Sequence, residues 1–347
     1  MPLISLGCWK LAKSAAADAV YSAIKLGYRG IDSACDYGNE VEVGQGIGRA
    51  LAENICTREE LFITSKLWCT NHAPEHVGPA LHRSLRDLGL AHLDLFLIHF
   101  PIPLAYVDPA TRYPPEWLHD PGAAQPRMVP ARVPLAATWA AILAQQDAGL
   151  ARSVGVCNFS TALLRDLANS APAGRHPEVL QVELHLYLQQ AKLLRYCAAE
   201  GIHVTGFSPL GAGSYVEIGG ATPADSALVD PAVVRIAQRL GATPAQVALA
   251  WALRAGRSVV PKSASPARQA ENLAAGAIAA FSEEDLAALR ALDKNRRFND
   301  PGVLCVDCIV PRRMAFPSIS LTISPRFRLP PPCSCEGAFN TFTPIYE

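Results

Sequence analysis

Residues 30–37 read Gly30-Ile31-Asp32-Ser33-Ala34-Cys35-Asp36-Tyr37, a short apolar run that ends in an acid and leads to a tyrosine. We interpret the run as a strand with Asp32 at its C-terminal end and Tyr37 on the loop beyond it. Two further apolar runs end in the same way, residues 61–66 at Lys66 and residues 93–99 at His99. A parallel α/β barrel collects such strand ends at one mouth, so the pattern predicts a pocket built from these four side chains.

The four side chains suit proton donation to a substrate. A free tyrosine has a pKa of about 10 and is a poor acid at neutral pH until a nearby cation stabilises its phenolate. Lys66 supplies such a cation, and Asp32 would hold the lysine in place. The residue types therefore indicate general acid catalysis at Tyr37.

Short apolar runs alternate with amphipathic segments along the chain, which predicts repeated strand and helix units. Eight repeats favour a closed parallel barrel over an open doubly wound sheet. We therefore expect an α/β fold of the (β/α)8 TIM-barrel type, with two extra helices that start at Thr243-Pro244 and at Ser282. The predicted strands are residues 3–6, 30–32, 61–66, 93–99, 153–157, 179–183, 203–207 and 258–262.

Several predicted helices have readable ends, with Ser14, Pro74 and Ser160 at their starts. The glycine cluster at residues 44–48 follows no strand and lacks the order of a dinucleotide-binding turn, so it predicts a tightly packed helix. Residues 57–60 have capping-box spacing but abut a strand, and are expected to form only a turn. The helices predicted with bounds are residues 15–26, 75–88, 161–169, 244–255 and 283–292.

Long connections are expected at the C-terminal ends of the strands, where catalytic loops of a barrel lie. Residues 101–134 are rich in proline and irregular, which indicates a semi-rigid wall or lid. Residues 208–230 contain four glycines, which suits a flap that closes over a ligand.

Composition narrows the class of protein. Thirty-one basic residues balance thirty-one acidic ones among 347, so charge gives no reason to propose nucleic acid or an anionic membrane as a partner. No leader pattern opens the chain, and no apolar run reaches the roughly 18 residues of a membrane span. We expect a cytoplasmic protein. The cysteines at 8, 35, 56, 69, 157 and 197 are scattered singly and are expected to be reduced, buried thiols.

The ordered motifs resemble those of the aldo-keto reductases, and within that family they are most similar to the xylose reductases. The resemblance covers residues 1–307, which would form one NADPH-dependent oxidoreductase domain. It implies a (β/α)8 barrel with NADPH across its C-terminal face. The matching motifs are Gly7-Cys8-Trp9-Lys10, Gly27-Tyr28-Arg29-Gly30-Ile31-Asp32, Asn39-Glu40, Ser65-Lys66-Leu67-Trp68, Leu97-Ile98-His99-Phe100-Pro101, Gly155-Val156-Cys157-Asn158-Phe159, Gln181-Val182-Glu183, Ser208-Pro209-Leu210-Gly211 and Val260-Pro261-Lys262-Ser263.

The resemblance assigns catalytic roles to Asp32, Tyr37, Lys66 and His99. Tyr37 would protonate the carbonyl oxygen as hydride arrives, with Lys66 lowering its pKa and Asp32 pairing with Lys66. His99 would hydrogen-bond the carbonyl oxygen and orient it.

The resemblance also implies a cofactor site for NADPH, with NADH left open as a second coenzyme. Asn158 and Gln181 match residues that hold the carboxamide, and Phe207 keeps the ring that stacks on nicotinamide. The family usually has Ser at Cys157 and Tyr at Phe207, so cofactor binding is expected to survive but to be looser. The remaining implied cofactor residues are Ser208 and Leu210, the 2′-phosphate cradle of Lys262, Ser263 and Arg268, and the adenine contacts Glu271 and Asn272.

Substrate residues implied by the likeness are Trp9, Asp36, His99, Phe100 and Asn299. In the xylose reductases the residues matching Asp36 and Asn299 contact sugar hydroxyls, and the one matching Trp9 walls the pocket. The alternative is a generalist aldehyde reductase, in which Asp36 is an exposed turn acid and Asn299 only part of a C-terminal segment.

Three features depart from the family or belong to no reductase motif. The chain begins about ten residues later than family members, so the N-terminal hairpin that closes the barrel bottom is expected to be missing. Residues 308–347 show no periodicity and are interpreted as a disordered tail or an incorrectly assigned end. Cys305 and Cys308 with Cys333 and Cys335 could suggest zinc, but the second pair is spaced too tightly for a standard zinc knuckle. His72 and His76 are expected to be surface residues at a helix start. No metal site is expected.

Three alternative functions stay open. A Schiff-base aldolase would also use a barrel lysine, but it has no need of a phosphate cradle at Lys262 and Arg268. A non-catalytic barrel subunit would usually lack one of the four catalytic side chains. A sugar-phosphate reductase of the same family is the nearest rival, and it would want an additional basic group near the pocket mouth. The sequence does not decide the particular sugar or aldehyde, or whether the protein is a monomer or a dimer.

Overall fold

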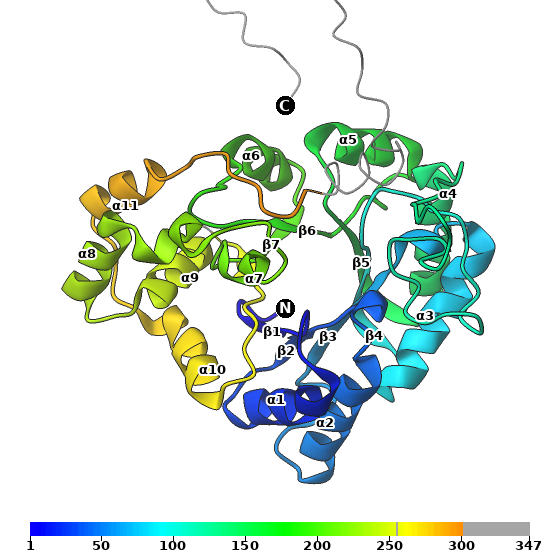
Figure 1. The fold of residues 1–347 in the computed structure, drawn as a ribbon, viewed down its shortest axis with the longest axis horizontal. Coiled ribbons are helices and arrows are strands. Elements are labelled where there is room, and N and C mark those ends of the chain that lie inside the picture. The colour runs from blue at the N-terminus through cyan, green and yellow to red at the C-terminus, as the bar shows by residue number, and fades with distance from the viewer. Residues whose placement is uncertain (255, 301–347) are drawn as a thin grey trace, which may run out of the picture. The chain divides into compact units, whose positions relative to one another are not determined.

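Eight parallel strands form the centre of the molecule, surrounded by helices (Figure 1). The computed structural model describes residues 1–254 and 256–300. Each strand pairs with the next one along the chain, and the bridge between Ile4 and Val259 brings β1 against β8. The strands are β1 Ser5–Gly7, β2 Gly30–Asp32, β3 Phe62–Leu67, β4 Leu93–Ile98, β5 Ala151–Cys157, β6 Val179–Glu183, β7 His203–Phe207 and β8 Ser258–Val259. This is the predicted (β/α)8 barrel.

All eight predicted strands are present, with bounds that differ by a few residues. The largest difference is β8, which ends at Val259 rather than at Lys262. Pro261 has no N–H to continue a ladder, although its carbonyl still accepts a hydrogen bond from the Gly7 N–H at 3.0 Å. The chain therefore leaves the sheet three residues before Lys262 and turns toward the next helix.

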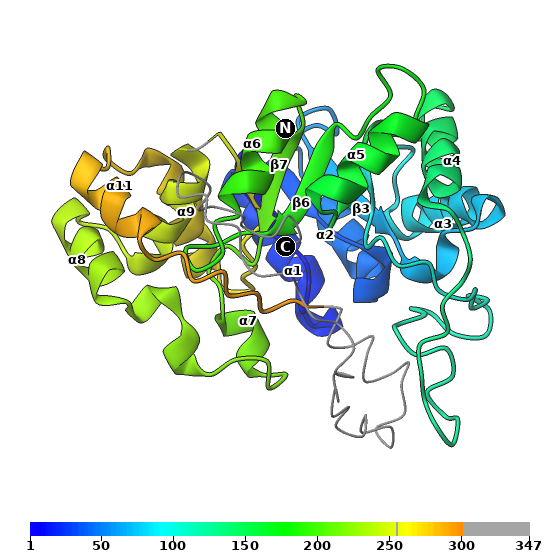
Figure 2. The same cartoon turned by 90° about the horizontal axis from the view of Figure 1, so that it is seen from above.

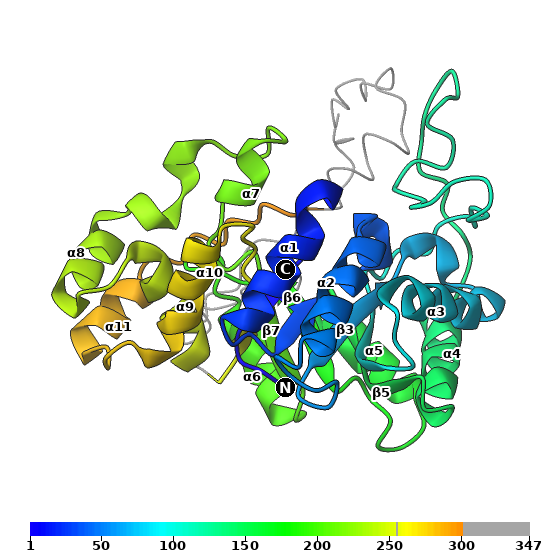
Figure 3. The same ribbon diagram turned by 90° about the horizontal axis from the view of Figure 1, so that it is seen from below.

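Helices cover the outside of the barrel, as Figures 2 and 3 show from two further sides. Those of at least eight residues are α1 Lys13–Lys25, α2 Glu40–Ala52, α3 Pro74–Leu88, α4 Leu135–Asp147, α5 Thr161–Ser170, α6 Ala191–Ala199, α8 Pro231–Leu240, α9 Pro244–Arg254, α10 Pro266–Leu273 and α11 Glu283–Arg290. A four-residue helix, α7, spans Gly213–Val216. Short 3-10 turns lie at Cys35–Tyr37, Cys69–Asn71, Pro223–Asp225, Ala227–Val229 and Ala274–Ala277.

The predicted helix ends were partly wrong. Ser160 caps α5 by accepting from the Leu163 N–H, and Ser282 forms a capping box with Asp285, as expected. Helix α1 instead begins at Lys13 after Ala12, and no side chain caps it, so Ser14 lies inside the helix.

Helix α8 was missed, although its ends carry ordinary signals. The Asp230 carboxylate accepts from the Ala232 N–H at 3.0 Å, Pro231 opens the first turn, and Gly241 ends the helix at φ 61°. The two helices expected at residues 244–255 and 283–292 are α9 and α11. The segment between β7 and β8 is thus more helical than its glycines suggested.

The glycine cluster at residues 44–48 lies within α2, as predicted. A Cβ at Gly44 would come within 2.7 Å of the Leu88 backbone, and one at Gly46 within 2.5 Å of the Ala17 carbonyl oxygen. These glycines therefore let α2 pack closely against α1 and α3, and they do not form a nucleotide-binding turn.

Two long connections lie at C-terminal strand ends. Residues 101–134 contain no helix or regular strand, as expected, and have only an isolated bridge between Leu104 and Pro130. Residues 208–230 are not simply a flexible flap, since they include α7 and two 3-10 turns. The described chain reaches β1 at Ser5 with no hairpin before it. The predicted domain boundary at 307, the tail 308–347 and its cysteines lie outside the described residues.

The sheet separates two apolar layers. Leu93, Phe96 and Ile98 of β4 pack with the outer helices, whereas Leu95 and Leu97 form a separate cluster with Cys157 and Val179. Because Leu97 lies in register with Lys66 on the neighbouring parallel strand, both side chains point to the same face of the sheet. The inner cluster therefore lies beneath the polar groups at the barrel mouth.

Candidate active site

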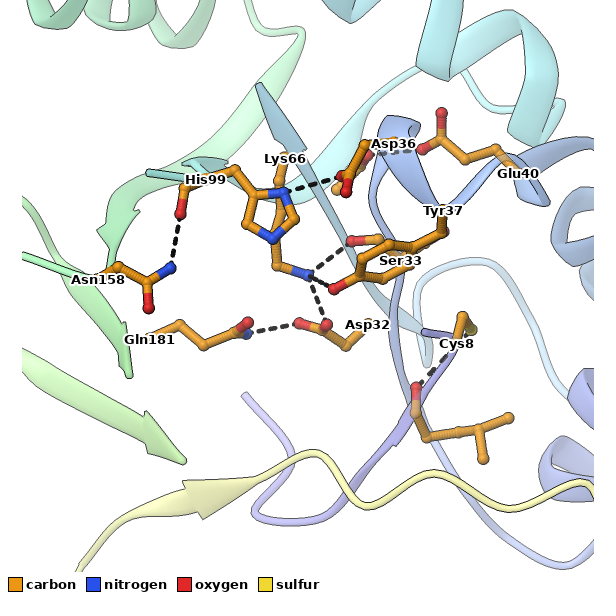
Figure 4. A network of polar contacts seen from close by, with 12 residues as sticks. Cys8, Asp32, Ser33, Asp36, Tyr37, Glu40, Lys66, His99, Asn158 and Gln181 are labelled. Carbon is orange, nitrogen blue, oxygen red and sulfur yellow. Dashed lines mark hydrogen bonds and ion pairs between the residues drawn. The ribbon is translucent and has the colours of Figure 1, made fainter. Parts of the chain in front are cut away.

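Lys66 lies at the centre of the polar groups predicted from the strand ends (Figure 4). Its Nζ is 2.6 Å from Asp32 Oδ1 and 3.3 Å from the Tyr37 hydroxyl oxygen. It also donates to the Ser33 carbonyl at 2.8 Å, a contact that the sequence did not indicate. The lysine thus joins the carboxylate and the phenol, as the residue types predicted.

Local structure brings these side chains together. Asp32 is the last residue of β2, and Lys66 lies one residue before the end of β3. Tyr37 ends a 3-10 turn, and Gly38 follows at φ 69°, a backbone conformation that glycine adopts without strain. The Cys35 thiol at the start of that turn donates to the Lys66 carbonyl at 3.3 Å, which ties the turn to β3.

Burial dominates the electrostatics of the site. The Lys66 side chain is fully buried, which alone would lower its pKa, but Asp32 and Tyr37 outweigh burial and raise it. Burial raises the pKa of Tyr37 well above its ordinary value, and the charge of Lys66 acts in the opposite direction. Lys66 therefore opposes the rise without reversing it, and Tyr37 keeps its proton at neutral pH.

His99 follows β4 and faces an acid. Its Nδ1 is 2.9 Å from Asp36 Oδ1, but the angles are not those of a hydrogen bond. Neither atom has a hydrogen-bond partner among the described residues. Figure 4 shows the other ring nitrogen on the side of Lys66 and Tyr37. His99 therefore holds one ring nitrogen against a carboxylate and turns the other toward Lys66 and Tyr37.

Two amides connect the predicted cofactor residues to these groups. Gln181 Nε2 donates to Asp32 Oδ2 at 2.6 Å, and Asn158 Nδ2 donates to the His99 carbonyl at 2.8 Å. Asp32 is therefore held between Lys66 and Gln181. Cys157, next to Asn158, is buried, and burial raises the pKa of its thiol, so it is a neutral neighbour of the site.

The other cofactor candidates follow β7 and β8. Phe207 ends β7, and the Ser208 hydroxyl lies 2.7 Å from the Tyr215 hydroxyl. Leu210 is partly buried against the core. These residues form one edge of the barrel mouth.

Beyond β8, two cations are arranged to receive an anion. Lys262 follows the strand and Arg268 lies in the first turn of α10, both exposed and in no ion pair among the described residues. Ser263 is buried beside them, and its hydroxyl accepts from the Ser265 N–H at 3.1 Å. Unpaired Lys and Arg groups at a helix N-terminus are the donor set that a phosphate dianion requires, so the residues present fit a 2′-phosphorylated nucleotide.

The two adenine candidates have protein partners of their own. Glu271 accepts a hydrogen bond from the Thr243 hydroxyl at 2.6 Å. Asn272 is buried on the inner side of α10. Both residues lie on the helix that carries Arg268.

Comparisons with known proteins fit this arrangement. The sequence model of the Aldo/keto reductase family matches residues 3–294. The chain belongs to the aldo/keto reductase family. It is 47% identical over 303 residues to a protein of Arthroderma otae named as a probable NAD(P)H-dependent D-xylose reductase, a match that covers 87% of this chain and 90% of that protein. A NAD(P)H-dependent D-xylose reductase of Pyricularia oryzae is 44% identical over 303 residues, covering 87% and 92% respectively.

A solved structure is similar to this aldo/keto reductase in fold as well. The aldose reductase from Schistosoma japonicum superposes with a TM-score of 0.75 at 33% identity, over 86% of this chain and 90% of that one. The resemblance stated from the motifs is therefore confirmed.

The substrate candidates of this aldo/keto reductase fall into two groups of contacts. Asp36 lies beside His99, where Phe100 stacks on His99 with ring centroids 4.9 Å apart. Trp9 lies against Tyr215, at 5.7 Å between centroids. Neither Phe100 nor Trp9 is fully exposed, so both can wall a pocket.

Asn299 is placed by a residue whose role was not predicted. Glu183, fully buried at the end of β6, accepts from the Phe298 N–H at 2.8 Å and from the Asn299 N–H at 2.9 Å. Its Oε1 also lies 3.0 Å from His185 Nε2. An acid at the end of a predicted strand was the available signal, since three other site residues were found in that way.

Tyr215 is a second residue that the sequence did not single out. It contacts Trp9, stacks on Phe298 at 5.7 Å and meets the Ser208 hydroxyl. It lies in α7, inside the segment interpreted as a flap, which connects that segment to both predicted cofactor and substrate residues.

Metal ligation finds no support in the described part of the chain. No group of three or more His, Cys, Asp or Glu side chains there could hold an ion. His72 was wrongly expected at the surface: it is buried, its carbonyl accepts from the Thr138 hydroxyl at 2.8 Å, and burial lowers its pKa to about 4. His76 instead stacks on Tyr106. The six cysteines at 8, 35, 56, 69, 157 and 197 are free and buried, as predicted.

Among residues 1–254 and 256–300, no helix has both the length and the apolar character needed to cross a bilayer.

Proposed function

We propose that this aldo/keto reductase reduces the aldehyde of an open-chain aldose, of the xylose type, to the corresponding alcohol with NADPH. The observation that carries the proposal is Lys66 buried between Asp32 and the Tyr37 hydroxyl at the barrel mouth. Two relatives that match most of the chain are named as NAD(P)H-dependent D-xylose reductases, which supports both coenzyme and substrate class.

The coenzyme, when bound, supplies the hydride. Lys262, Ser263 and Arg268 would hold its 2′-phosphate, because the two cations are exposed beside the start of α10 and neither forms an ion pair with the described part of the chain. Asn158 and Gln181 would meet the carboxamide through their amide oxygens, since one N–H of each already donates within the protein. Phe207, Ser208 and Leu210 would line the nicotinamide edge, and Glu271 and Asn272 the adenine end.

Tyr37 would give its proton to the carbonyl oxygen. Burial keeps the hydroxyl protonated, and Lys66 stabilises the phenolate that the transfer leaves behind. Asp32 keeps Lys66 charged and aimed at Tyr37, and Gln181 fixes Asp32 from its other oxygen. The arrangement makes the proton available at one defined atom without making Tyr37 acidic in solution.

His99 would orient the carbonyl. With Asp36 beside Nδ1, the other ring nitrogen is left to hydrogen-bond the substrate oxygen. The Phe100 ring stacked on His99 restricts the orientation of the imidazole. Asp36 would thus serve His99 as well as a sugar hydroxyl.

Recognition of hydroxyls would come from Asp36, Asn299 and the rim at Trp9. Buried Glu183 holds the backbone of Asn299, so its amide is supplied by a fixed segment rather than by a free loop end. A sugar-phosphate reductase would want an additional basic group at the mouth. Lys10, beside Trp9, is already engaged by the Ser214 carbonyl at 2.7 Å and by Glu217 at 3.4 Å. A cytoplasmic location and the monomeric or dimeric state stay predictions.

Steady-state NADPH oxidation across three substrate classes tests the proposal. We expect kcat/KM for xylose to exceed that for its phosphate ester, and xylose to be reduced alongside a simple aromatic aldehyde. If only the aromatic aldehyde is converted to its alcohol, the protein is a generalist aldehyde reductase. Preference for the phosphate ester would favour the sugar-phosphate reductase instead.

A further inference from the structure

A cavity of about 470 Å³ lies between α6, α9 and α11 on the outside of the barrel. Figures 1 and 2 show α9 and α11 next to one another. None of the residues that line it belongs to the candidate active site. The cavity is therefore separate from the active site, and the proposed reductase reaction makes no use of its side chains.

Arg257 is the unusual residue of this cavity. It is 7% exposed, and its Nε and Nη1 find no hydrogen-bond partner within residues 1–254 and 256–300. No acid pairs with it among the described residues, and its guanidinium lies 4.7 Å from the centre of the Trp251 ring. Burial lowers the pKa of Arg257 to about 10, which leaves the guanidinium charged at neutral pH. A buried, unpaired cation is costly unless something compensates for it.

Two more arginines line the same cavity. Arg254 ends α9 and Arg290 ends α11, and both are exposed. Arg254 is partly fixed, since it donates to the Ile278 carbonyl at 3.1 Å. None of the described residues that line the cavity is acidic. Three guanidinium groups around one cavity without a carboxylate favour an oxyanion, which arginine binds in a bidentate manner.

The remaining wall is apolar and aromatic. Trp251 and Phe281 line it together with Leu194 and Leu286. Arg254 lies 5.4 Å from the Phe281 ring and Arg257 lies near Trp251, so each cation borders an aromatic face. A cavity of this volume with such walls suits a ligand that has a flat apolar body as well as a charged head.

We propose that this cavity binds a small organic oxyanion, a phosphate ester or carboxylate carried on an aromatic body. Its charged head pairs with Arg257, and Arg254 and Arg290 close around it from the rim. The ring packs against Trp251 and Phe281. The site is separate from the cofactor cradle at Lys262 and Arg268, so both can be filled at once.

Phenyl phosphate and benzoate serve as probes, with benzyl alcohol as the neutral comparison. Calorimetric titration of the full chain in saturating NADPH keeps the cofactor cradle filled. We expect saturable binding of one phenyl phosphate per chain and none of benzyl alcohol. Benzoate distinguishes the source of the head group: tighter phenyl phosphate indicates a phosphate ester, and tighter benzoate a carboxylate. Absence of saturable binding of both anions would overturn the proposal.

Arg257→Met tests the central contact. It should weaken anion binding at least tenfold and raise the melting temperature of the ligand-free protein, because an unpaired buried charge is removed. Arg195→Met, at an exposed arginine of α6 outside the cavity, is the matched control and should leave both quantities unchanged. Unchanged anion binding in Arg257→Met would contradict the proposal.

If Arg257→Met does not fold, the double variant Arg254→Met/Arg290→Met decides, since both residues are exposed and their loss should spare the fold. It is expected to weaken phenyl phosphate binding at least tenfold while NADPH binding stays unchanged. If that variant still binds phenyl phosphate as the wild type does, the anion lies elsewhere and the proposed site is refuted. Loss of phenyl phosphate binding in Arg268→Ala instead would refute it in the same way.

Discussion

Lys66 performs several tasks through one nitrogen atom. It contacts Asp32, the Ser33 carbonyl and Tyr37, and burial excludes water that could replace any of them. The lysine thus determines both where the Tyr37 hydroxyl lies and how stable its phenolate is. Because burial outweighs that stabilisation before substrate binds, Tyr37 is ready as an acid across neutral pH.

Tyr37→Phe removes the proton and leaves the ring. We expect kcat for xylose to fall by about 10² to 10⁴, the usual contribution of a general acid. NADPH binding, followed by cofactor fluorescence, should be unchanged because the phosphate cradle is untouched. Near wild-type reduction by the variant would refute the assignment of Tyr37.

Arg268→Ala should separate the two coenzymes. Loss of one cation beside the 2′-phosphate is expected to weaken NADPH by about 2 kcal/mol, the lower end of the range for a truncated charge pair, because Arg268 is exposed. NADH, which lacks that phosphate, should change little. Arg195→Ala is the control at an exposed arginine of another helix. Equal losses of NADPH and NADH would show that Arg268 acts only through structure.

Asn299→Ala tests hydroxyl recognition. An aldose loses a hydrogen-bonding partner worth about 1 to 3 kcal/mol, so kcat/KM for xylose should fall. An aromatic aldehyde uses the same Tyr37 and provides the internal control. Asp36 is the less selective test, since it faces His99 and its loss should affect both substrates. If Asn299→Ala lowers kcat/KM equally for xylose and for the aromatic aldehyde, the aldose assignment is wrong.

At the scale of elements, Glu40 connects α2, β3 and α3 beneath the site. It opens α2, and its carboxylate accepts from Ser65 of β3 at 2.6 Å and from Ser84 of α3 at 2.9 Å. The acid is fully buried. Burial raises the pKa of Glu40 from its usual 4.5 to about 7, although both hydroxyls act to lower it.

The raised pKa gives a pH dependence of stability. Between pH 4.5 and about 7 the unfolded chain has lost this proton while the folded chain keeps it, so the free energy of unfolding falls as pH rises. The loss is complete above pH 7 and amounts to at most roughly 3 kcal/mol, at about 1.4 kcal/mol for each pH unit. His72, whose pKa burial lowers to about 4, contributes the opposite slope below its usual 6.5.

Glu40→Gln removes the part of the pH dependence of stability that is due to Glu40. Urea unfolding should show the variant gaining stability relative to wild type as pH rises from 5 to 8, because Gln cannot ionise. The contribution of His72 is common to both proteins and cancels in the difference. A difference between variant and wild type that is the same at pH 5 and pH 8 would contradict a raised pKa at Glu40.

Strands were easier to predict than helices in this chain. Several strands are short runs of apolar residues closed by a polar one, as in residues 93–99, and that pattern is local. Helix α1 starts without a side-chain cap, so Ser14 was misleading. Helix α8 had clear ends at Asp230 and Gly241, but the glycines before it drew attention to a loop.

At the scale of the whole molecule, closure of the barrel creates the contacts that sequence alone did not supply. Gln181 reaches Asp32 across 149 positions, and Glu183 holds Asn299 across 116. Strand ends predicted which residues meet at the mouth, because parallel strands all end there. They could not predict that Asp36 turns toward His99, or that no acid of the described residues pairs with buried Arg257, since both depend on how loops pack.

The assembled barrel is expected to transfer hydride from NADPH to an open-chain aldose. The most direct measurement incubates the full chain with NADPH and xylose and counts both NADPH oxidised and pentitol formed. We predict one alcohol for each NADPH consumed, and neither product with Tyr37→Phe beyond a small residual rate. NADPH that stays reduced in the presence of xylose, or oxidation without pentitol, would contradict the account.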